Sequence, residues 1–343
     1  MDLRHDVVAL LFVVAAVGTV AGCGGDSGSS GSAKPRGPAS AELRSQLDAA
    51  TNTNTAQFPK TRGRTLRELA DSLDGSGPQI GFATGTLTTG KNQRLAFGVI
   101  DEKSGFVYAP TAVYLARSEN ARAKGPFAAP ADLLVTDPPF RSQTAATEKD
   151  PFAALYETRV PFDSPGRYAV LAVSKIKGQD VAAAGVVTVK RPAADRVPDV
   201  GERAPRVETD TVAGAGGDIK AIETRIPPDD MHDVNFKQVV GSKPVALLFA
   251  TPALCESRVC GPVVDIAAQL KSTYGDQIAF IHQEVFVGND ANKGLRPPLK
   301  AFQLQTEPWL FVVGADGRVT ARLEGSFGFN AFERALKTAV KPQ

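Results

Sequence analysis

The sequence predicts two folded regions of different class, an all-β sandwich followed by an α/β domain. From about residue 79 to 190, short apolar stretches alternate with turn residues, as they do in antiparallel sheets. From about residue 200, apolar strands alternate with helical segments, which indicates parallel strands joined by helices. A Pro-rich stretch over 191–199 separates the two patterns and is the predicted linker. The predicted boundaries are therefore 79–190 for the sandwich and 200–343 for the α/β domain.

Composition fits a folded protein and excludes several classes. The chain has 343 residues, of which 43% are hydrophobic and 22% are charged, so global disorder is excluded. The 39 basic and 37 acidic residues give a formal net charge of +2. Nucleic-acid-binding domains carry a clear basic excess, so nucleic acid is not expected as a partner. Three cysteines are too few for a disulfide-rich scaffold or a multi-cysteine metal cage.

The N-terminus has the pattern of a bacterial lipoprotein signal peptide over residues 1–22. Residues 7–20 are almost entirely apolar, but the run is short for a membrane span. Its end, Val20-Ala21-Gly22-Cys23, resembles a lipobox, which implies cleavage before Cys23 and attachment of lipid to that cysteine. The acyl chains would hold the protein on the extracytoplasmic face of a bacterial membrane. The alternative is an uncleaved anchor or a buried helix.

Residues 23–78 are predicted to tether the folded part to this anchor. Residues 24–38 are rich in Gly, Ser and Pro, a composition that is typical of a flexible linker. Residues 41–50 and 65–73 have weak helical spacing, so they are expected to be short helices or a continuation of the tether. Outside the cytoplasm no glutathione pool keeps thiols reduced, so the two remaining cysteines can form a disulfide.

The region from 79 to 190 is expected to be built from short strands. Leu95, Phe97 and Val99 alternate with smaller residues, as in a strand with one buried face. The region loosely resembles a bacterial immunoglobulin-like module, with Tyr168 in one of its strands. It contains no catalytic cluster, so a spacer or binding role is expected. The candidate strands are 80–86, 94–100, 111–117, 155–160, 167–173 and 185–190.

The α/β domain is expected to have a buried central strand at 244–250, where the sequence is continuously apolar. Apolar residues then recur at helical spacing from Pro262 to Thr273, and Pro262 suits the first turn of a helix. Asn330, with Glu333 three residues later, resembles a capping box that starts a final helix. Further strands are expected at 277–285, 309–313 and 318–323, with a short helix at 298–302 and a hairpin turn at 315–317.

In this order of elements the chain resembles the thioredoxin-like superfamily, particularly its extracytoplasmic redoxin and TlpA-like branch. The resemblance covers about 200–343 and is carried by four segments: Gly201-Glu202-Arg203-Ala204-Pro205, residues 243–262 (KPVALLFATPALCESRVCGP), Glu307-Pro308, and the hairpin at 314–317. It implies a thioredoxin-like fold and a thiol–disulfide oxidoreductase that needs no cofactor. Its partners would be extracytoplasmic protein thiols or disulfides. It further implies that Cys255 attacks, that Cys260 resolves, and that Pro308 is a cis-proline beside the redox pair.

The position of the two cysteines favours this chemistry independently of the resemblance. Cys255 and Cys260 lie between the central strand and the following helix, whose positive end lowers the pKa of a nearby thiol. A thiolate attacks a disulfide to give a mixed disulfide, which the second thiol resolves. Four residues separate the cysteines, whereas the usual motif of the superfamily has two. Because Cys260 lies nearer the helix start, the residues alone leave open which cysteine attacks.

Two other interpretations stay open from the sequence. Nearby extracytoplasmic cysteines can staple a loop, and the protein would then be a non-enzymatic surface binding module. Alternatively, two thiolates and His282, late in the second predicted strand, would offer soft donors for copper. This set resembles that of the Sco-like copper chaperones of the same superfamily. The adjacent pair Met231-His232, in a polar loop, gives a weaker metal-binding signal.

Overall fold

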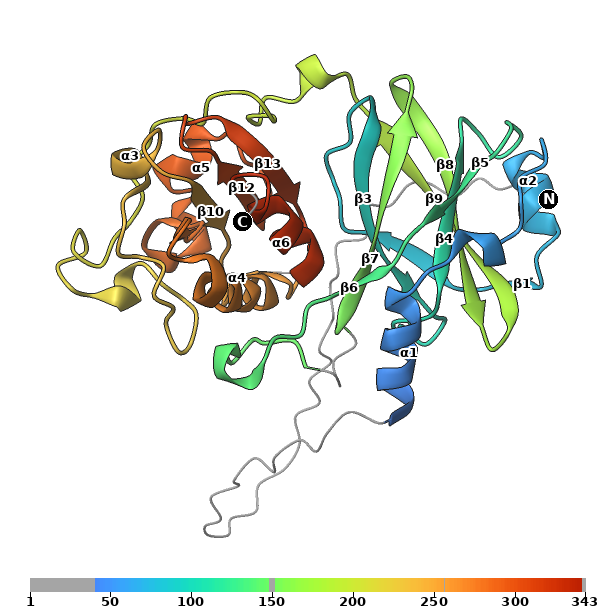
Figure 1. The fold of residues 1–343 in the computed structure, drawn as a ribbon, viewed down its shortest axis with the longest axis horizontal. Helices are drawn as coiled ribbons and strands as arrows, with labels where there is room; N and C mark the ends of the chain where they lie inside the picture. Colours follow the sequence, from blue (N-terminus) through green and yellow to red (C-terminus); the bar gives the residue numbers. More distant parts are fainter. Residues whose placement is uncertain (1–40, 148–151, 256, 341–343) are drawn as a thin grey trace, which may run out of the picture. The chain divides into compact units, whose positions relative to one another are not determined.

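The computed structural model describes residues 41–147, 152–255 and 257–340. The predicted signal peptide, the predicted lipid attachment point Cys23 and the predicted tether up to residue 40 lie outside the described residues. Within the described residues, the strands form three sheets (Figure 1). None of the described helices is both long enough and apolar enough to span a bilayer.

The first part of the chain forms a two-sheet sandwich. One sheet has the order β1-β9-β8-β4-β5 and the other β2-β3-β7-β6. Phe97 and Tyr156 from one sheet share a core with Val113 and Val170 from the other. The strands are β1 (Gly75–Ser76), β2 (Gln79–Phe82), β3 (Gly90–Ile100), β4 (Thr111–Ala116), β5 (Lys124–Ala128), β6 (Ala131–Leu133), β7 (Ala154–Phe162), β8 (Gly166–Ile176) and β9 (Gln179–Val189).

Each of the six strand segments predicted between 79 and 190 overlaps a strand of the structure, but β1, β5 and β6 have no counterpart in the prediction. These three strands lie at sheet edges, where only one neighbouring strand shapes the sequence. In β5, Gly125 and Pro126 also interrupt the alternation of apolar residues on which strand prediction depends. The likeness of this region to an immunoglobulin module stays a prediction.

The two segments with weak helical spacing form helices that pack on the sandwich. Leu47 of α1 (Ala41–Thr51) lies in the core between the two sheets. Leu69 of α2 (Leu66–Asp71) is buried against Tyr114 of β4. Thr65 caps α2 through its side chain and Glu68 bonds back to the Thr65 N–H, which satisfies two backbone donors. These parts of the predicted tether therefore belong to the folded structure.

The third sheet has the order β11-β10-β12-β13, and its strand directions are those of a thioredoxin-like domain. The central strand β10 is parallel to β11 and antiparallel to β12, and β12 is antiparallel to β13. The strands are β10 (Val245–Phe249), β11 (Ala279–Gln283), β12 (Trp309–Val313) and β13 (Val319–Glu324). The predicted thioredoxin-like fold of the C-terminal part is thus present in this sheet.

Helices cover both faces of this sheet because its central strand is apolar on both sides. Leu248 of β10 shares a core with α4 (Cys260–Tyr274) and α6 (Phe329–Leu336). Phe249, on the opposite face, packs in a core with α3 (Phe236–Val239) and α5 (Pro297–Ala301). Every residue of β10 is buried, as the continuous apolar run predicts.

Two helix starts differ from the prediction. Helix α4 begins at Cys260, two residues before Pro262, so Cys260 is itself part of the helix. The predicted capping box at Asn330 and Glu333 is wrong, because Gly328 is the N-cap residue of α6. The N–H groups of Asn330 and Ala331 instead donate to the carboxylate of Asp132 in β6, each at 2.8 Å. A carboxylate from a distant segment thus satisfies the helix donors that a local side chain was expected to satisfy.

The sandwich and the thioredoxin-like domain share one core, and Ala39–Gln343 form one compact unit. Leu155 of β7 lies in the same hydrophobic cluster as Phe327 and Phe332. Buried Arg94 of β3 donates to Glu157 Oε2 at 2.6 Å and to the Ser326 carbonyl at 2.6 Å. The residues on either side of the predicted linker are therefore joined by direct contacts.

Gly325 lies where the two parts approach each other most closely by backbone. Its φ is +68°, and a Cβ atom there would lie 1.8 Å from the carbonyl oxygen of Ala83. Its N–H donates to the Pro308 carbonyl at 3.0 Å. Only glycine fits this position without displacing backbone.

Candidate active site

The two cysteines form a disulfide in the loop between β10 and α4. Cys255 and Cys260 are joined, with their Cα atoms 6.0 Å apart. Cys260 is the first residue of α4, and no described side chain caps this end of the helix. The positive end of the helix therefore faces the disulfide, which favours a thiolate there after reduction.

The two sulfur-bearing residues differ in exposure. Cys255 is half-buried in the loop, whereas Cys260 has no exposed surface and lies in the core beside α4. Ser257 Oγ lies 3.3 Å from Cys255 Sγ, so its hydroxyl can donate to a thiolate at that sulfur. The neighbouring Leu254 is 38% exposed, an unusual exposure for a leucine beside a core strand. Of the two residues, Cys255 is therefore the one with surface exposed to solvent.

Glu307 and Pro308 lie beside the disulfide because of the pairing between β10 and β12. Phe249, the last residue of β10, pairs with Trp309, the first residue of β12, so the residues just before β12 meet the cysteine loop. The Glu307–Pro308 peptide bond is cis, as the family resemblance implies. Glu307 Oε2 accepts a hydrogen bond from the Thr251 N–H at 2.6 Å and lies 3.5 Å from Cys260 Sγ.

Glu307 is a candidate functional residue that sequence patterns do not indicate. Its neighbour Pro308 was predicted to lie beside the redox pair, and the register of the strands could have placed Glu307 there as well. What sequence patterns could not provide is the direction of the side chain. The carboxylate points to the buried sulfur, Cys260, and is held by the backbone N–H of Thr251.

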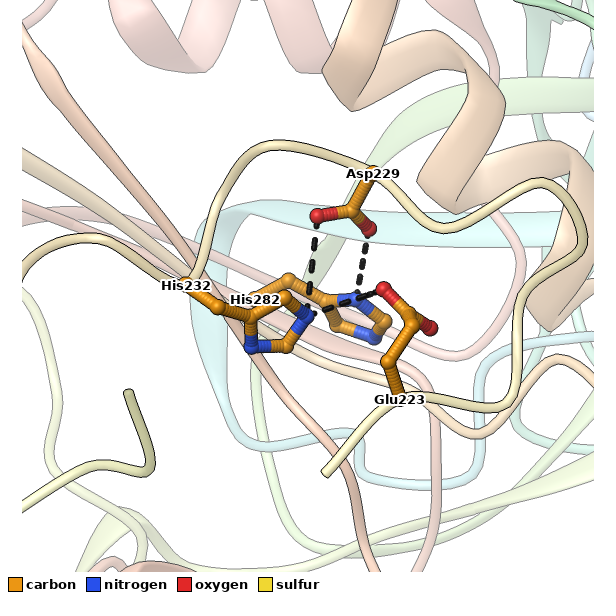
Figure 2. Close-up of side chains that lie close together, drawn as sticks. All are labelled: Glu223, Asp229, His232 and His282. Atoms are coloured by element: carbon orange, nitrogen blue, oxygen red, sulfur yellow. Dashed lines mark hydrogen bonds and ion pairs between the residues drawn. The ribbon is translucent and has the colours of Figure 1, made fainter. Parts of the chain in front are cut away.

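The structure places His282 in a different group of side chains. His282 of β11 gathers with Glu223, Asp229 and His232 (Figure 2). The two cysteines gather instead with Glu307. His282 Nδ1 lies 2.8 Å from Asp229 Oδ2, and His282 Nε2 lies 3.0 Å from the Ala250 carbonyl oxygen. Among the described residues, the structure therefore does not bring together the three donors of the copper alternative.

The charges in this second group shift the pKa values of its members. Burial raises the pKa of Glu223, but the charge of His282 and hydrogen bonds from both histidines outweigh burial and hold that pKa well below its usual range. Burial lowers the pKa of His282, but the charges of Glu223 and Asp229 outweigh burial and raise that pKa well above its usual range. Sequence patterns indicated His282, and more weakly His232, but not the two carboxylates.

Comparisons with known proteins add structural likenesses only. The sequence matches no protein-family model, and a search of curated proteins finds no similar protein. The structure is similar to a thiol:disulfide interchange protein of the thioredoxin family from Chlorobium tepidum TLS, at 18% identity, covering 42% of this chain and 97% of that one, with a TM-score of 0.29.

Two further solved structures match parts of the chain. MTB DsbF, in its mixed oxidized and reduced forms, is 15% identical, and the match covers 40% of this chain and 97% of that one, with a TM-score of 0.27. The PKD domain from the human VPS10 domain-containing receptor SorCS2 is 16% identical, and the match covers 48% of this chain and 98% of that one, with a TM-score of 0.18. At these scores the thioredoxin-like assignment rests on the strand order and directions described above.

Proposed function

We propose that this protein is a thiol–disulfide oxidoreductase that exchanges disulfides with partner proteins through Cys255 and Cys260. The observation that carries the proposal is the unequal exposure of the two sulfur-bearing residues in one disulfide at the start of α4. Exchange needs one sulfur that a partner can reach and a second that only the first can reach. A structural staple has no need of this asymmetry.

The unequal exposure supports a division of roles between the two cysteines. In the reducing direction, the Cys255 thiolate attacks one sulfur of the partner disulfide, forms a mixed disulfide and displaces the other partner sulfur as a thiolate. Cys260 then loses its proton and attacks the Cys255 sulfur. This step restores the Cys255–Cys260 disulfide and releases the second partner sulfur. Two electrons pass from the cysteine pair to the partner, and the oxidising direction reverses the same steps.

Glu307 is the proton acceptor that the geometry offers to Cys260. Its Oε2 atom is the carboxylate oxygen next to the buried sulfur, and the Thr251 N–H holds it in place. A negative charge at this distance disfavours a second negative charge on Cys260, so the resolving thiol stays protonated until the mixed disulfide has formed. The carboxylate can then take the proton as Cys260 attacks.

A trapping experiment tests the assignment of the two cysteines. With insulin as the disulfide substrate, Cys260→Ser should accumulate a mixed disulfide through Cys255, because no second thiol can resolve it. Cys255→Ser should form none, because Cys260 is buried. Both variants should lose dithiothreitol-dependent insulin reduction. Retention of the wild-type rate by either variant would contradict the proposal.

The reduction potential separates exchange from the structural-staple alternative. Structural disulfides of secreted proteins have potentials below about −300 mV, and exchanging disulfides lie above that range. We expect the Cys255–Cys260 pair to equilibrate with glutathione or dithiothreitol buffers in the folded protein, measured by thiol alkylation. A bond that is reduced only after unfolding would favour a non-enzymatic binding module with a structural disulfide.

We also propose that the exchange takes place at the extracytoplasmic face of a bacterial membrane, with the chain anchored by lipid on Cys23. The lipobox-like residues Val20-Ala21-Gly22-Cys23 support the anchor, and the presence of a disulfide agrees with a compartment that lacks a glutathione pool. In cells fed an alkyne fatty acid, Cys23→Ser should lose the lipid label and leave the membrane fraction. Cys255→Ser is the matched control and should keep both. Equal labelling of the two variants would exclude Cys23 as the attachment point.

A further inference from the structure

We propose that Glu223, Asp229, His232 and His282 form a buried binding site for one divalent transition-metal ion, with zinc as the ion that the donors fit best. This four-residue group is separate from the cysteine pair, and it includes none of the donors proposed for disulfide exchange. Two imidazoles and two carboxylates are the nitrogen and oxygen ligands that Zn²⁺ takes in proteins.

The donor atoms lie close enough together for all four residues to reach one ion after small adjustments of their side chains. Zinc–ligand bonds of about 2.1 Å place neighbouring ligand atoms about 3.4 Å apart. His232 Nε2 lies 2.9 Å from Glu223 Oε2 and 3.6 Å from Asp229 Oδ1. His282 Nδ1 lies 3.3 Å from Glu223 Oε2 and 2.8 Å from Asp229 Oδ2. All four donor groups converge on one point, as Figure 2 shows, with one ligand atom from each residue within 4.8 Å of the others.

The hydrogen bond at the far side of His282 prepares its ring for a cation. The Ala250 carbonyl can only accept, so His282 Nε2 carries a hydrogen and donates it. Nδ1 then faces the oxygens of Glu223 and Asp229, and something positive must lie between them, either a proton or a metal ion. A histidine that donates its second N–H to a backbone carbonyl is the usual arrangement of a metal ligand.

The ring of His232 can turn a lone pair toward an ion when its Nε2 atom gives up the hydrogen bond to Glu223. Its Nδ1 atom is buried and has no hydrogen-bond partner among the described residues. The proton of a neutral ring can therefore sit on Nδ1 and leave Nε2, the atom next to Glu223, free to bind an ion.

A divalent ion also balances the charge of the four side chains once it has displaced the proton between His282 and the two carboxylates. Two carboxylates and two neutral imidazoles carry a charge of −2, and the side chains of all four residues are at most 1% exposed. One divalent cation makes this buried group neutral, which removes the large penalty for an uncompensated buried charge.

An ion here would join two segments that are separate in sequence. Glu223, Asp229 and His232 lie in the long connection before α3, and His282 lies in β11. Thr224, next to Glu223, accepts a hydrogen bond from the Ala253 N–H at 3.2 Å, in the loop that leads to Cys255. The site therefore has a structural role, in which the ion fastens the 223–232 segment to the sheet and supports the base of the cysteine loop.

Metal titration of the oxidised protein tests the proposal without interference from sulfur. With the Cys255–Cys260 disulfide closed, the chain should bind one equivalent of Zn²⁺ and show a higher Tm with Zn²⁺ than after treatment with a chelator. Co²⁺ in place of Zn²⁺ should give the visible absorption of a tetrahedral ion with nitrogen and oxygen ligands, without sulfur charge-transfer bands. These readouts do not depend on exchange activity, so they remain valid if the proposed function fails.

Two near-isosteric variants locate the ion, and a neighbouring one serves as control. Glu223→Gln and Asp229→Asn should each lower the affinity for Zn²⁺ at least 10-fold, because each removes a charged ligand. Asp233→Asn changes the exposed carboxylate next to His232 and should leave the affinity unchanged. Circular dichroism checks that each variant is folded, and one folded variant of the two is enough to test the position of the ion. If the wild-type protein does not bind Zn²⁺, shared protons hold the cluster together and the proposal is overturned. If a folded variant binds Zn²⁺ as tightly as the wild-type protein, the ion lies elsewhere and the proposal is also overturned.

Discussion

Glu307 connects the sulfur chemistry to the central sheet. Its carboxylate lies 3.5 Å from Cys260 Sγ, and its backbone precedes the cis-proline next to the start of β12. A side chain in this position affects the resolving thiol more than the attacking one. The two halves of the exchange cycle should therefore respond differently to its removal.

We predict that Glu307→Gln slows the resolving step by roughly 10²-fold, because glutamine keeps the shape of the side chain but cannot accept the Cys260 proton. Formation of the mixed disulfide, which depends on Cys255, should change much less. Stopped-flow measurement of both phases with a fluorescent disulfide substrate separates the two steps. Asp316→Asn, in the exposed hairpin, is the control, and an equal loss in both phases would contradict the assigned role.

The candidate site was predictable where its signal is local in sequence. Cys255 and Cys260 follow from their positions relative to one strand and one helix, and Pro308 follows from the family resemblance. Glu307, Glu223 and Asp229 do not, because each becomes part of a site only through contacts between distant segments. The Glu307 oxygen approaches Cys260 across 47 residues of sequence, and Asp229 meets His282 across 53. No periodicity or spacing encodes such contacts.

At the scale of elements, the N-terminus of α6 depends on a carboxylate from the sandwich. Asp132 of β6 is only 3% exposed and accepts the N–H groups of Asn330 and Ala331. Burial raises the pKa of Asp132 to about 6, although these two hydrogen bonds act to lower it. The ordinary aspartate pKa of about 3.9 applies in the unfolded chain.

This shift predicts a definite dependence of stability on pH. Between about pH 4 and pH 6 the folded state holds the Asp132 proton more tightly than the unfolded state does, so this residue makes the protein less stable as the pH rises. The contribution is at most about 3 kcal/mol over this range. The free energy of unfolding, measured with urea at several pH values, should fall less steeply with rising pH in Asp132→Asn than in the wild-type protein. Asp163→Asn, which changes an exposed carboxylate, is the control and should keep the wild-type pH dependence. A slope unchanged by Asp132→Asn would rule out the raised pKa.

Elements with a strong internal pattern were predicted, and those defined by their neighbours were not. The apolar run of β10 and the helical spacing of α4 are properties of one segment, and both elements formed where the pattern indicated. The start of α6 was wrongly assigned to Asn330, because its capping partner lies 198 residues earlier in the chain. Edge strands such as β1, with two residues, have no pattern of their own.

At the scale of the whole molecule, buried polar contacts unite the two parts that the sequence separates. Arg94 pairs with Glu157 inside the sandwich and also donates to the carbonyls of Glu324 and Ser326 in the thioredoxin-like domain. Glu157 Oε1 also accepts a hydrogen bond from the guanidinium of Arg334 in α6 at 2.7 Å. Removing Arg94 leaves buried acceptors without their donor in both parts at once.

We predict that Arg94→Leu lowers the free energy of unfolding by roughly 3 kcal/mol or more, as expected when one partner of a buried ion pair is removed. Because both parts share the core, the variant should still unfold in one transition. Fluorescence of Trp309, the single tryptophan, and far-UV circular dichroism should give coincident curves. Arg167→Leu, at an exposed position of β8, is the control and should leave the free energy of unfolding nearly unchanged. Separate transitions for the two probes in the wild-type protein would show that the two parts unfold independently.

The close approach at Gly325 limits how this protein can be recombined with others. A side chain there would collide with the Ala83 backbone, so the thioredoxin-like half meets the sandwich without a clash only if it carries glycine at this point. A chimera that exchanges this half for another redox domain will need a glycine with positive φ directly after its last strand.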